Sequence, residues 1–193
     1  MPMDNAKSTD VVGGEIVRGN QSDSHAKAGG IFHVQCHDKD GNLKWEATKH
    51  NLVVNEGLVD MNTKYFTGSS YTAAWYIGLY GAAASNDPAA SDTMSSHAGW
   101  TEVTAYSQST RPAATFGSAT SAVPSVISNS GSPATYSING TTVVGGAFLT
   151  SSNTKGGTSG TLFSAADFQS PGDRSVVNGD TLTVTYTFSL DAA

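Results

Sequence analysis

The chain has 193 residues, enough for one domain with a hydrophobic core, and only 13% of them are charged, about half the usual share. A net charge of −6 without any Lys/Arg cluster argues against nucleic acid as a direct partner, because phosphates are bound by basic patches. The single cysteine excludes an intrachain disulfide. No apolar run approaches the roughly 20 residues of a membrane span, and the first residues do not resemble a signal peptide. We therefore expect synthesis in the cytoplasm and no membrane partner.

Residues 1–29 are predicted to form an extended N-terminal arm, followed by a β-rich domain at 30–193. The arm is rich in Ser, Asp, Asn, Gly and Ala, and it contains one apolar island, VVGGEIV, with the aliphatic residues Val11, Val12, Ile16 and Val17. Such a composition cannot bury enough surface to fold alone. Two interpretations stay open: a tail packed against its own domain, or an arm that lies on a partner. In the second, the four aliphatic residues are the candidate contacts.

The stretch HVQCHDKDGNLKWEATKHN, residues 33–51, combines three histidines and the cysteine with a DKDGN string. A calcium loop beginning at Asp38 would need Gly at its sixth position and Glu at its twelfth, where Leu43 and Lys49 stand. A zinc site is also disfavoured, because His33 and His37 would be roughly 13 Å apart on a strand. We therefore predict no metal site here.

The same stretch favours a β-hairpin with a two-residue type I′ turn at Asp40-Gly41. That turn would place Cys36 opposite Trp45, and Val34 opposite Ala47. One face of the hairpin would then be apolar and the other polar, as in a half-buried antiparallel pair, with the cysteine a small buried residue.

After the hairpin, NLVVNEGLVDMNTKYF predicts a strand end followed by a short helix capped by Asn55. Four apolar residues recur at helical spacing and are expected in the core: Leu58, Met61, Tyr65 and Phe66. AWYIGLYG, residues 74–81, reads as a buried strand, and a long loop follows it.

From Trp100 onward the sequence predicts short strands separated by turn residues. The last strand alternates most clearly, with Leu182, Val184, Tyr186 and Phe188 on one face and threonines on the other. Many short strands and one short helix predict an all-β fold, an antiparallel β-sandwich or jelly roll.

Few residues of the second half could carry catalysis. No Glu follows Glu102 and no His follows His97, and the nearest match to a serine-hydrolase elbow, at 157–161, lacks its closing glycine. A carboxylate pair of Glu46 with Glu102 or Asp60 is neither excluded nor favoured. We expect no catalytic residues, no cofactor and no enzymatic activity.

Several blocks, in this order, resemble a known family: HNLVVNEGLVDM, AWYIGLYG, SSHAGWTEVTAYSQSTRPA, TVVGGAFLTSS, GTLFSAADF and SVVNGDTLTVTYTFSL. They look like small virion proteins of tailed bacteriophages, which include head decoration (cement) proteins. The resemblance spans about residues 30–190 and leaves the arm outside.

This resemblance implies a β-rich, non-enzymatic protein that is made in the host cytoplasm, coats the outer surface of the phage head and stabilises the capsid. Its partners would be the major capsid protein and other copies of itself, as a dimer or trimer. The arm lies outside the resemblance, and the expectation that Val11, Val12, Ile16 and Val17 contact the capsid or a neighbouring copy rests on the composition of the arm alone.

The alternative is a receptor- or carbohydrate-binding β-sandwich module of a phage tail tip or fibre. Aromatic side chains would stack on sugars, and five are available, although most are expected in the core: Trp75, Tyr76, Tyr80, Trp100 and Tyr106.

Overall fold

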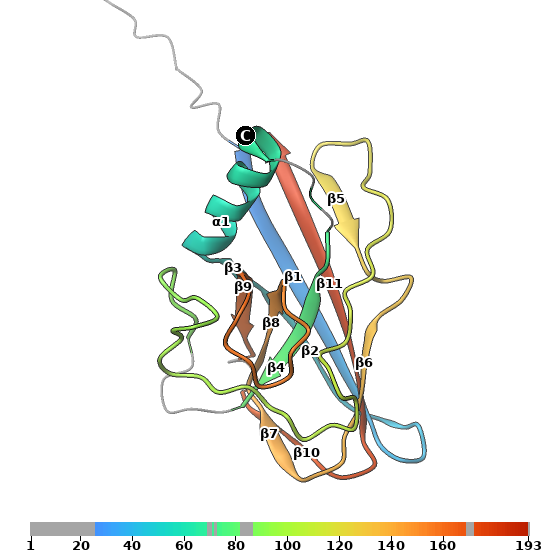
Figure 1. Cartoon of the computed structure of the whole chain (residues 1–193). Helices are drawn as coiled ribbons and strands as arrows, with labels where there is room; N and C mark the ends of the chain where they lie inside the picture. The colour runs from blue at the N-terminus through green and yellow to red at the C-terminus, as the bar shows by residue number, and fades with distance from the viewer. Residues whose placement is uncertain (1–25, 69–70, 72, 82–86, 169–171, 193) are drawn as a thin grey trace, which may run out of the picture.

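The computed structural model of the chain describes residues 26–68, 71, 73–81, 87–168 and 172–192. Antiparallel strands predominate in this part of the chain, and they are accompanied by one short helix (Figure 1). The prediction of an all-β, sandwich-like fold is confirmed.

The larger sheet is built on two twelve-residue strands, β1 (Ala26–His37) and β11 (Thr181–Ala192), which pair along their whole length. Strand β2 (Leu43–His50) pairs with the other edge of β1, while β5 (Ser125–Ser128) and β6 (Ala134–Ser137) pair with different parts of β11. Strand β1 thus begins four residues before position 30, the expected start of the domain. Residues 1–25, with the aliphatic island of the arm, lie outside the described residues.

The second sheet has the order β3-β9-β8-β4 and faces the larger one. Its strands are β3 (Leu52–Val53), β9 (Leu162–Asp167), β8 (Gly146–Thr150) and β4 (Tyr76–Tyr80). A separate pair is formed by β7 (Thr142–Val144) and β10 (Arg174–Val176). Helix α1 (Asn55–Asn62) contacts β9 and continues into the π-helical segment η1 (Thr63–Thr67).

The core lies between the two sheets, because alternate residues of the long strands point inward. Phe32, Val34 and Cys36 of β1 are buried in one cluster with Leu182 and other residues of β11. The predicted alternation of the last strand is confirmed through residue 186, whereas Phe188 is only partly buried. Of the five aromatic residues considered for sugar stacking, three are buried, namely Tyr80, Trp100 and Tyr106, and Trp75 and Tyr76 are half-buried.

The β1–β2 hairpin has the predicted register, with Cys36 opposite Trp45 and Val34 opposite Ala47. The predicted type I′ turn is wrong, because such a turn needs two residues with positive φ and only Gly41 has one, at 85°. The amide of Gly41 donates to the Asp38 carbonyl, and the Asp38 side chain accepts bonds from the amides of Asp40 and Asn42. These bonds favour a longer loop with a bulge, and they explain why the register shifts after Cys36.

Replacing Gly41 with valine should lower the free energy of unfolding by about 1 to 2 kcal/mol, because a β-branched residue is strained at positive φ. An added Cβ would meet no atom within 4 Å, so the loss of stability would come from the backbone conformation and not from a steric clash. Asparagine tolerates this conformation better, and G41N should lose less stability. Urea unfolding of both variants checks this, and equal losses would contradict it. A chelator that lowered the melting temperature of the wild type would instead reveal a bound metal.

The helix packs on a different face from the one predicted. Asn55 is its first residue and not its cap, since the N-cap position is Val54 and has no side-chain capping bond. Leu58, Tyr65 and Phe66 are exposed, so their assignment to the core is wrong, and only Met61 is partly buried. The buried helix residue is Gly57, which lies against the backbone of Phe163 in β9. A glycine on the packing face carries no hydrophobic signal, and this explains the error.

Candidate binding site

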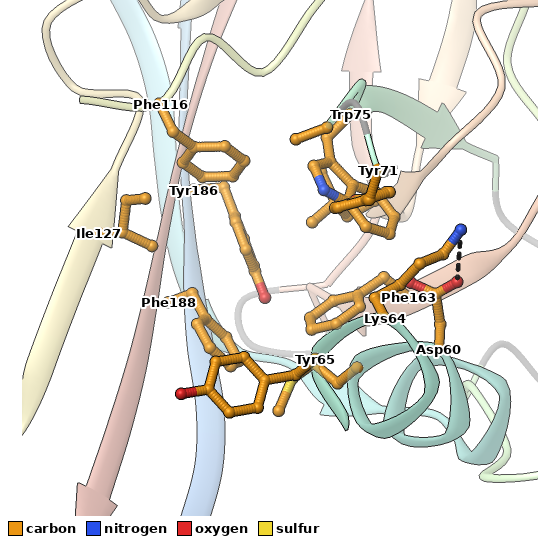
Figure 2. A pocket seen from close by; sticks show the side chains of 13 residues that line it. Asp60, Lys64, Tyr65, Tyr71, Trp75, Phe116, Ile127, Phe163, Tyr186 and Phe188 are labelled. Atoms are coloured by element: carbon orange, nitrogen blue, oxygen red, sulfur yellow. Dashed lines mark ion pairs between the residues drawn. The ribbon is translucent and has the colours of Figure 1, made fainter. Parts of the chain in front are cut away.

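A cavity of about 410 Å³ opens where α1 and η1 lie over the gap between the two sheets (Figure 2). Figure 2 shows aromatic side chains from both sheets around this space, with the helix closing one side. The cavity is lined by Asp60, Met61, Lys64, Tyr65, Tyr71, Ala73, Trp75, Phe116, Ile127, Leu149, Phe163, Tyr186 and Phe188. Most of these side chains are apolar, so the cavity suits an apolar group.

Helix α1 is positioned by two contacts with β9. Because Gly57 has no side chain, the helix backbone approaches the Phe163 backbone closely. One residue earlier, the Glu56 carboxylate accepts a hydrogen bond of 2.8 Å from the Leu162 amide. These contacts bring Met61 and Lys64, one and two turns further on, to the cavity.

The walls of the cavity are aromatic side chains in mutual contact. The ring of Phe163 meets those of Trp75 and Phe188 edge-on, with centroid distances of 5.3 and 5.5 Å. On the opposite wall, Phe116 meets Tyr186 at 6.2 Å. Edge-on contacts of this kind contribute about 0.5 to 1.5 kcal/mol each beyond the burial of the rings, so they favour the arrangement of rings that surrounds the cavity.

The polar atoms at the inner end of the cavity already have partners. The Tyr186 hydroxyl accepts hydrogen bonds from Asn51 Nδ2 at 2.8 Å and from Ser164 Oγ at 3.3 Å. Burial raises the pKa of Tyr186, so the hydroxyl stays neutral. The inner end therefore presents no charge to an occupant.

Charged groups lie instead at the rim. Asp60 and Lys64 form an ion pair of 3.9 Å across one helical turn, and the Lys64 ammonium lies 4.7 Å from the centre of the Tyr71 ring. Burial, helped by the nearby Asp60, raises the pKa of Tyr71. An adjacent hollow, more polar, shares these three residues and Trp75 and extends to Ser151 and Thr161. The whole arrangement fits a peptide-like occupant, with apolar side chains inside and polar groups at the rim.

The helix carries a second feature, an apolar surface formed by Leu58, Val59, Tyr65 and Phe66 and called here the α1–η1 surface, which borders the cavity at Tyr65. Tyr65 and Phe66 are 84% and 76% exposed, and their rings pack edge-on at 4.9 Å. Val59 is 64% exposed. Clustered exposed aromatic and aliphatic side chains are typical of a surface that binds a partner.

The candidate carboxylates lie in different surroundings. Glu46 is exposed and accepts a bond from Gln35 Nε2 at 3.3 Å, whereas Glu102 is paired with Arg111. Asp60 is at the cavity rim. His33 bonds Thr48 Oγ1 at 2.9 Å, and among the described residues no three His, Cys, Asp or Glu side chains are grouped so as to hold a metal ion.

Sequence reasoning missed the cavity, because its lining comes from segments far apart in the chain. The one available signal was the density of aromatic residues between Tyr65 and Tyr76, four of which were assigned singly to the core or to sugar binding. The arm residues Val11, Val12, Ile16 and Val17 cannot be placed in relation to it, since they are not among the described residues.

Fold and site together define an antiparallel β-sandwich-like protein with an apolar cavity between its sheets. Comparisons with family models, with curated proteins and with solved structures found no match. In the described part of the chain, no helix has the length and apolar character needed to cross a membrane.

Proposed function

We propose that the protein is a non-enzymatic virion structural protein of a tailed bacteriophage, which binds the outer capsid surface and stabilises the head. Its partners would be the major capsid protein and other copies of itself, as a dimer or trimer. The ordered blocks that resemble phage virion proteins support this proposal, and the β-rich fold agrees with it.

The observation that carries the proposal furthest is the α1–η1 surface. Removing apolar surface from water contributes about 25 cal/mol per Å² of favourable free energy, so covering two exposed aromatic rings favours association. Tyrosine is also enriched among the residues that dominate binding energy at interfaces. We assign the main capsid contact of the domain to Tyr65 and Phe66.

The arm would add a second contact. Its residues Val11, Val12, Ile16 and Val17 provide aliphatic side chains for a shallow groove on the capsid or on a neighbouring copy. Ordering an extended segment costs about 1 to 2 kcal/mol per residue in backbone entropy, so one arm binds weakly. An oligomer that brings several arms to adjacent sites raises their effective concentration and strengthens the attachment.

A double substitution of Tyr65 and Phe66 by serine should weaken binding to phage heads stripped of the protein by roughly 30-fold or more, which corresponds to about 2 kcal/mol. Cosedimentation with such heads measures it, and resistance of the heads to heat or osmotic shock should fall in parallel. Both residues are exposed, so urea unfolding should change by less than about 0.5 kcal/mol each.

The matched control is L43S, which removes an exposed apolar side chain from β2, next to the hairpin loop. It should bind heads like the wild type. Equal binding by the double variant and the wild type would show that the α1–η1 surface is not the capsid contact.

The runner-up, a carbohydrate- or receptor-binding module of a tail tip or fibre, is favoured by one observation. The Tyr71 ring is partly exposed beside the Asp60 carboxylate, and an aromatic ring next to a hydrogen-bonding carboxylate suits a sugar. Presence of the protein only on purified tails, with glycan binding by the isolated chain, would favour this function. Turnover of a polysaccharide that is lost in E46Q or E102Q would contradict the non-enzymatic assignment.

A further inference from the structure

We propose that the apolar cavity is a docking site for the chain's own N-terminal arm, and that the island VVGGEIV, residues 11–17, occupies it in the free protein. The inference concerns the isolated chain and does not depend on the proposed capsid function. For the free protein it corresponds to the first of the two interpretations that the sequence leaves open, the tail packed against its own domain, whereas the capsid contact proposed above applies to the assembled head.

The described chain begins close to the cavity. Ala26 starts β1 and pairs with Ala192 at the end of β11, and four residues later Gly30 lies opposite Phe188, which lines the cavity. Four strand residues span roughly 13 Å. The nine residues from Val17 to Ala26 can span about 30 Å, so the island can reach the cavity without strain.

The island also matches the chemistry of the site. Among residues 1–25, valine and isoleucine occur only in this island, so it is the one cluster of branched aliphatic side chains that the arm can offer to an apolar cavity. The charged residues beside the island also have counterparts of opposite charge at the rim of the cavity. Glu15 stands between the two aliphatic pairs, and Arg18 follows Val17. At the rim, Lys64 and Asp60 supply the opposite charges, and their own pair is long, at 3.9 Å, and therefore weak enough to exchange partners.

Tethering favours the chain's own arm over that of a second copy. A segment on a short linker has an effective concentration in the millimolar range at a site within its reach. A second copy at micromolar concentration competes poorly with it. The occupant in dilute solution is therefore the arm of the same chain.

The native cysteine makes a clean test possible. Cys36 is fully buried, and burial together with the nearby Asp180 raises the pKa of its thiol to about 11. A thiol that stays protonated and enclosed reacts slowly. A cysteine introduced by G19C, two residues after the island, can then be labelled selectively with a nitroxide in the full-length protein.

With this label we expect paramagnetic broadening of the NMR methyl signals of Met61, Ile127 and Leu149, which line the cavity. The methyl signals of Leu43, next to the hairpin loop, should stay sharp. Adding I16D and V17D should weaken this broadening several-fold, leaving only the effect of an undocked arm tethered at Ala26. The matched control, S8D with T9D, adds the same charges outside the island and should leave the broadening in place.

Three outcomes would overturn the proposal. Cavity signals that stay sharp in labelled G19C would show that the arm does not dock. Broadening that I16D and V17D leave undiminished would show that the aliphatic side chains are not what docks. In a mixture of isotope-labelled chains with nitroxide-labelled chains lacking the isotope, broadening would assign the occupant to a second copy. Unchanged chemical shifts of the buried Leu182 and Val184 methyl groups in every variant would verify that the domain remains folded.

Discussion

Replacing Arg111 with methionine should lower the free energy of unfolding by about 3 to 5 kcal/mol, the largest single-residue effect expected in this protein. The guanidinium is fully buried and Glu102 nearly so. The two side chains meet in a two-pronged pair, with Nε to Oε1 at 2.9 Å and Nη2 to Oε2 at 2.7 Å. Methionine fills a similar volume but leaves the Glu102 carboxylate buried without its counter-charge.

The loss would extend beyond the ion pair. Arg111 also donates to the carbonyls of Ser152 and Gly157, and Glu102 accepts a bond from the Gly156 amide. The pair therefore holds the loop after β8 against the segment that follows Trp100. Removal of the arginine leaves two carbonyls without donors and a carboxylate without its cation, and each costs free energy.

Urea unfolding of R111M measures the effect, and K39M is the matched control. Lys39 also pairs with a carboxylate, Asp40, at 2.7 Å, but both side chains are exposed, so K39M should cost less than about 1 kcal/mol. The double variant R111M with E102L should recover part of the loss, because no buried charge is left unpaired. Equal costs for R111M and K39M would contradict the stabilising role of the buried pair.

Replacing Gly57 with alanine should destabilise the protein by about 1 to 3 kcal/mol, although alanine normally stabilises a helix by about 0.5 to 1 kcal/mol relative to glycine. An alanine Cβ would overlap the carbonyl oxygen of Phe163 and would lie 2.9 Å from its Cα. These are backbone atoms of a strand in the middle of a sheet, so the helix must move outward. That movement would also separate Met61 from the opposite wall of the cavity.

The control is V59A in the same helix, where the side chain is exposed and the change should stay within about 0.5 kcal/mol. Thermal unfolding of both variants gives the comparison. A more stable G57A would show that the helix is not held by close approach to β9, and the account of how the cavity is formed would then be wrong.

The predictions that were confirmed rest on alternation along single strands. In the β1–β2 hairpin, the pairing of Cys36 with Trp45 followed from sorting apolar and polar residues onto two faces, and a shift by one residue would have placed Val34 in solvent. The turn failed for a local reason, since the Asp38 side chain accepts amide bonds that stabilise a longer loop. The Asp-Gly dipeptide alone does not indicate whether the two-residue turn or the longer loop is more stable.

The helix shows the limit of periodicity. Leu58, Met61 and Tyr65 have helical spacing, but the buried residue of α1 is Gly57, one position before Leu58, and of the three only Met61 is partly buried. The chain also changes to π-helical geometry at Thr63–Thr67, so the 3.6-residue period does not extend to Phe66. The resulting exposure of Tyr65 and Phe66 gives the molecule its α1–η1 surface.

The sequence by itself determined the all-β class, the alternation of β11 as far as Tyr186, the register of the first hairpin and the burial of Cys36, because each depends on a repeat of two residues within one stretch. Only the tertiary structure decided the packing face of α1, the Arg111–Glu102 pair and the apolar cavity. Each of these depends on segments distant in sequence, such as β5, β9, β11 and the helix around the cavity, and no local pattern encodes which of them meet. The approach of Gly57 to Phe163 is the plainest case, because the helix can lie this close to β9 only where it has no side chain.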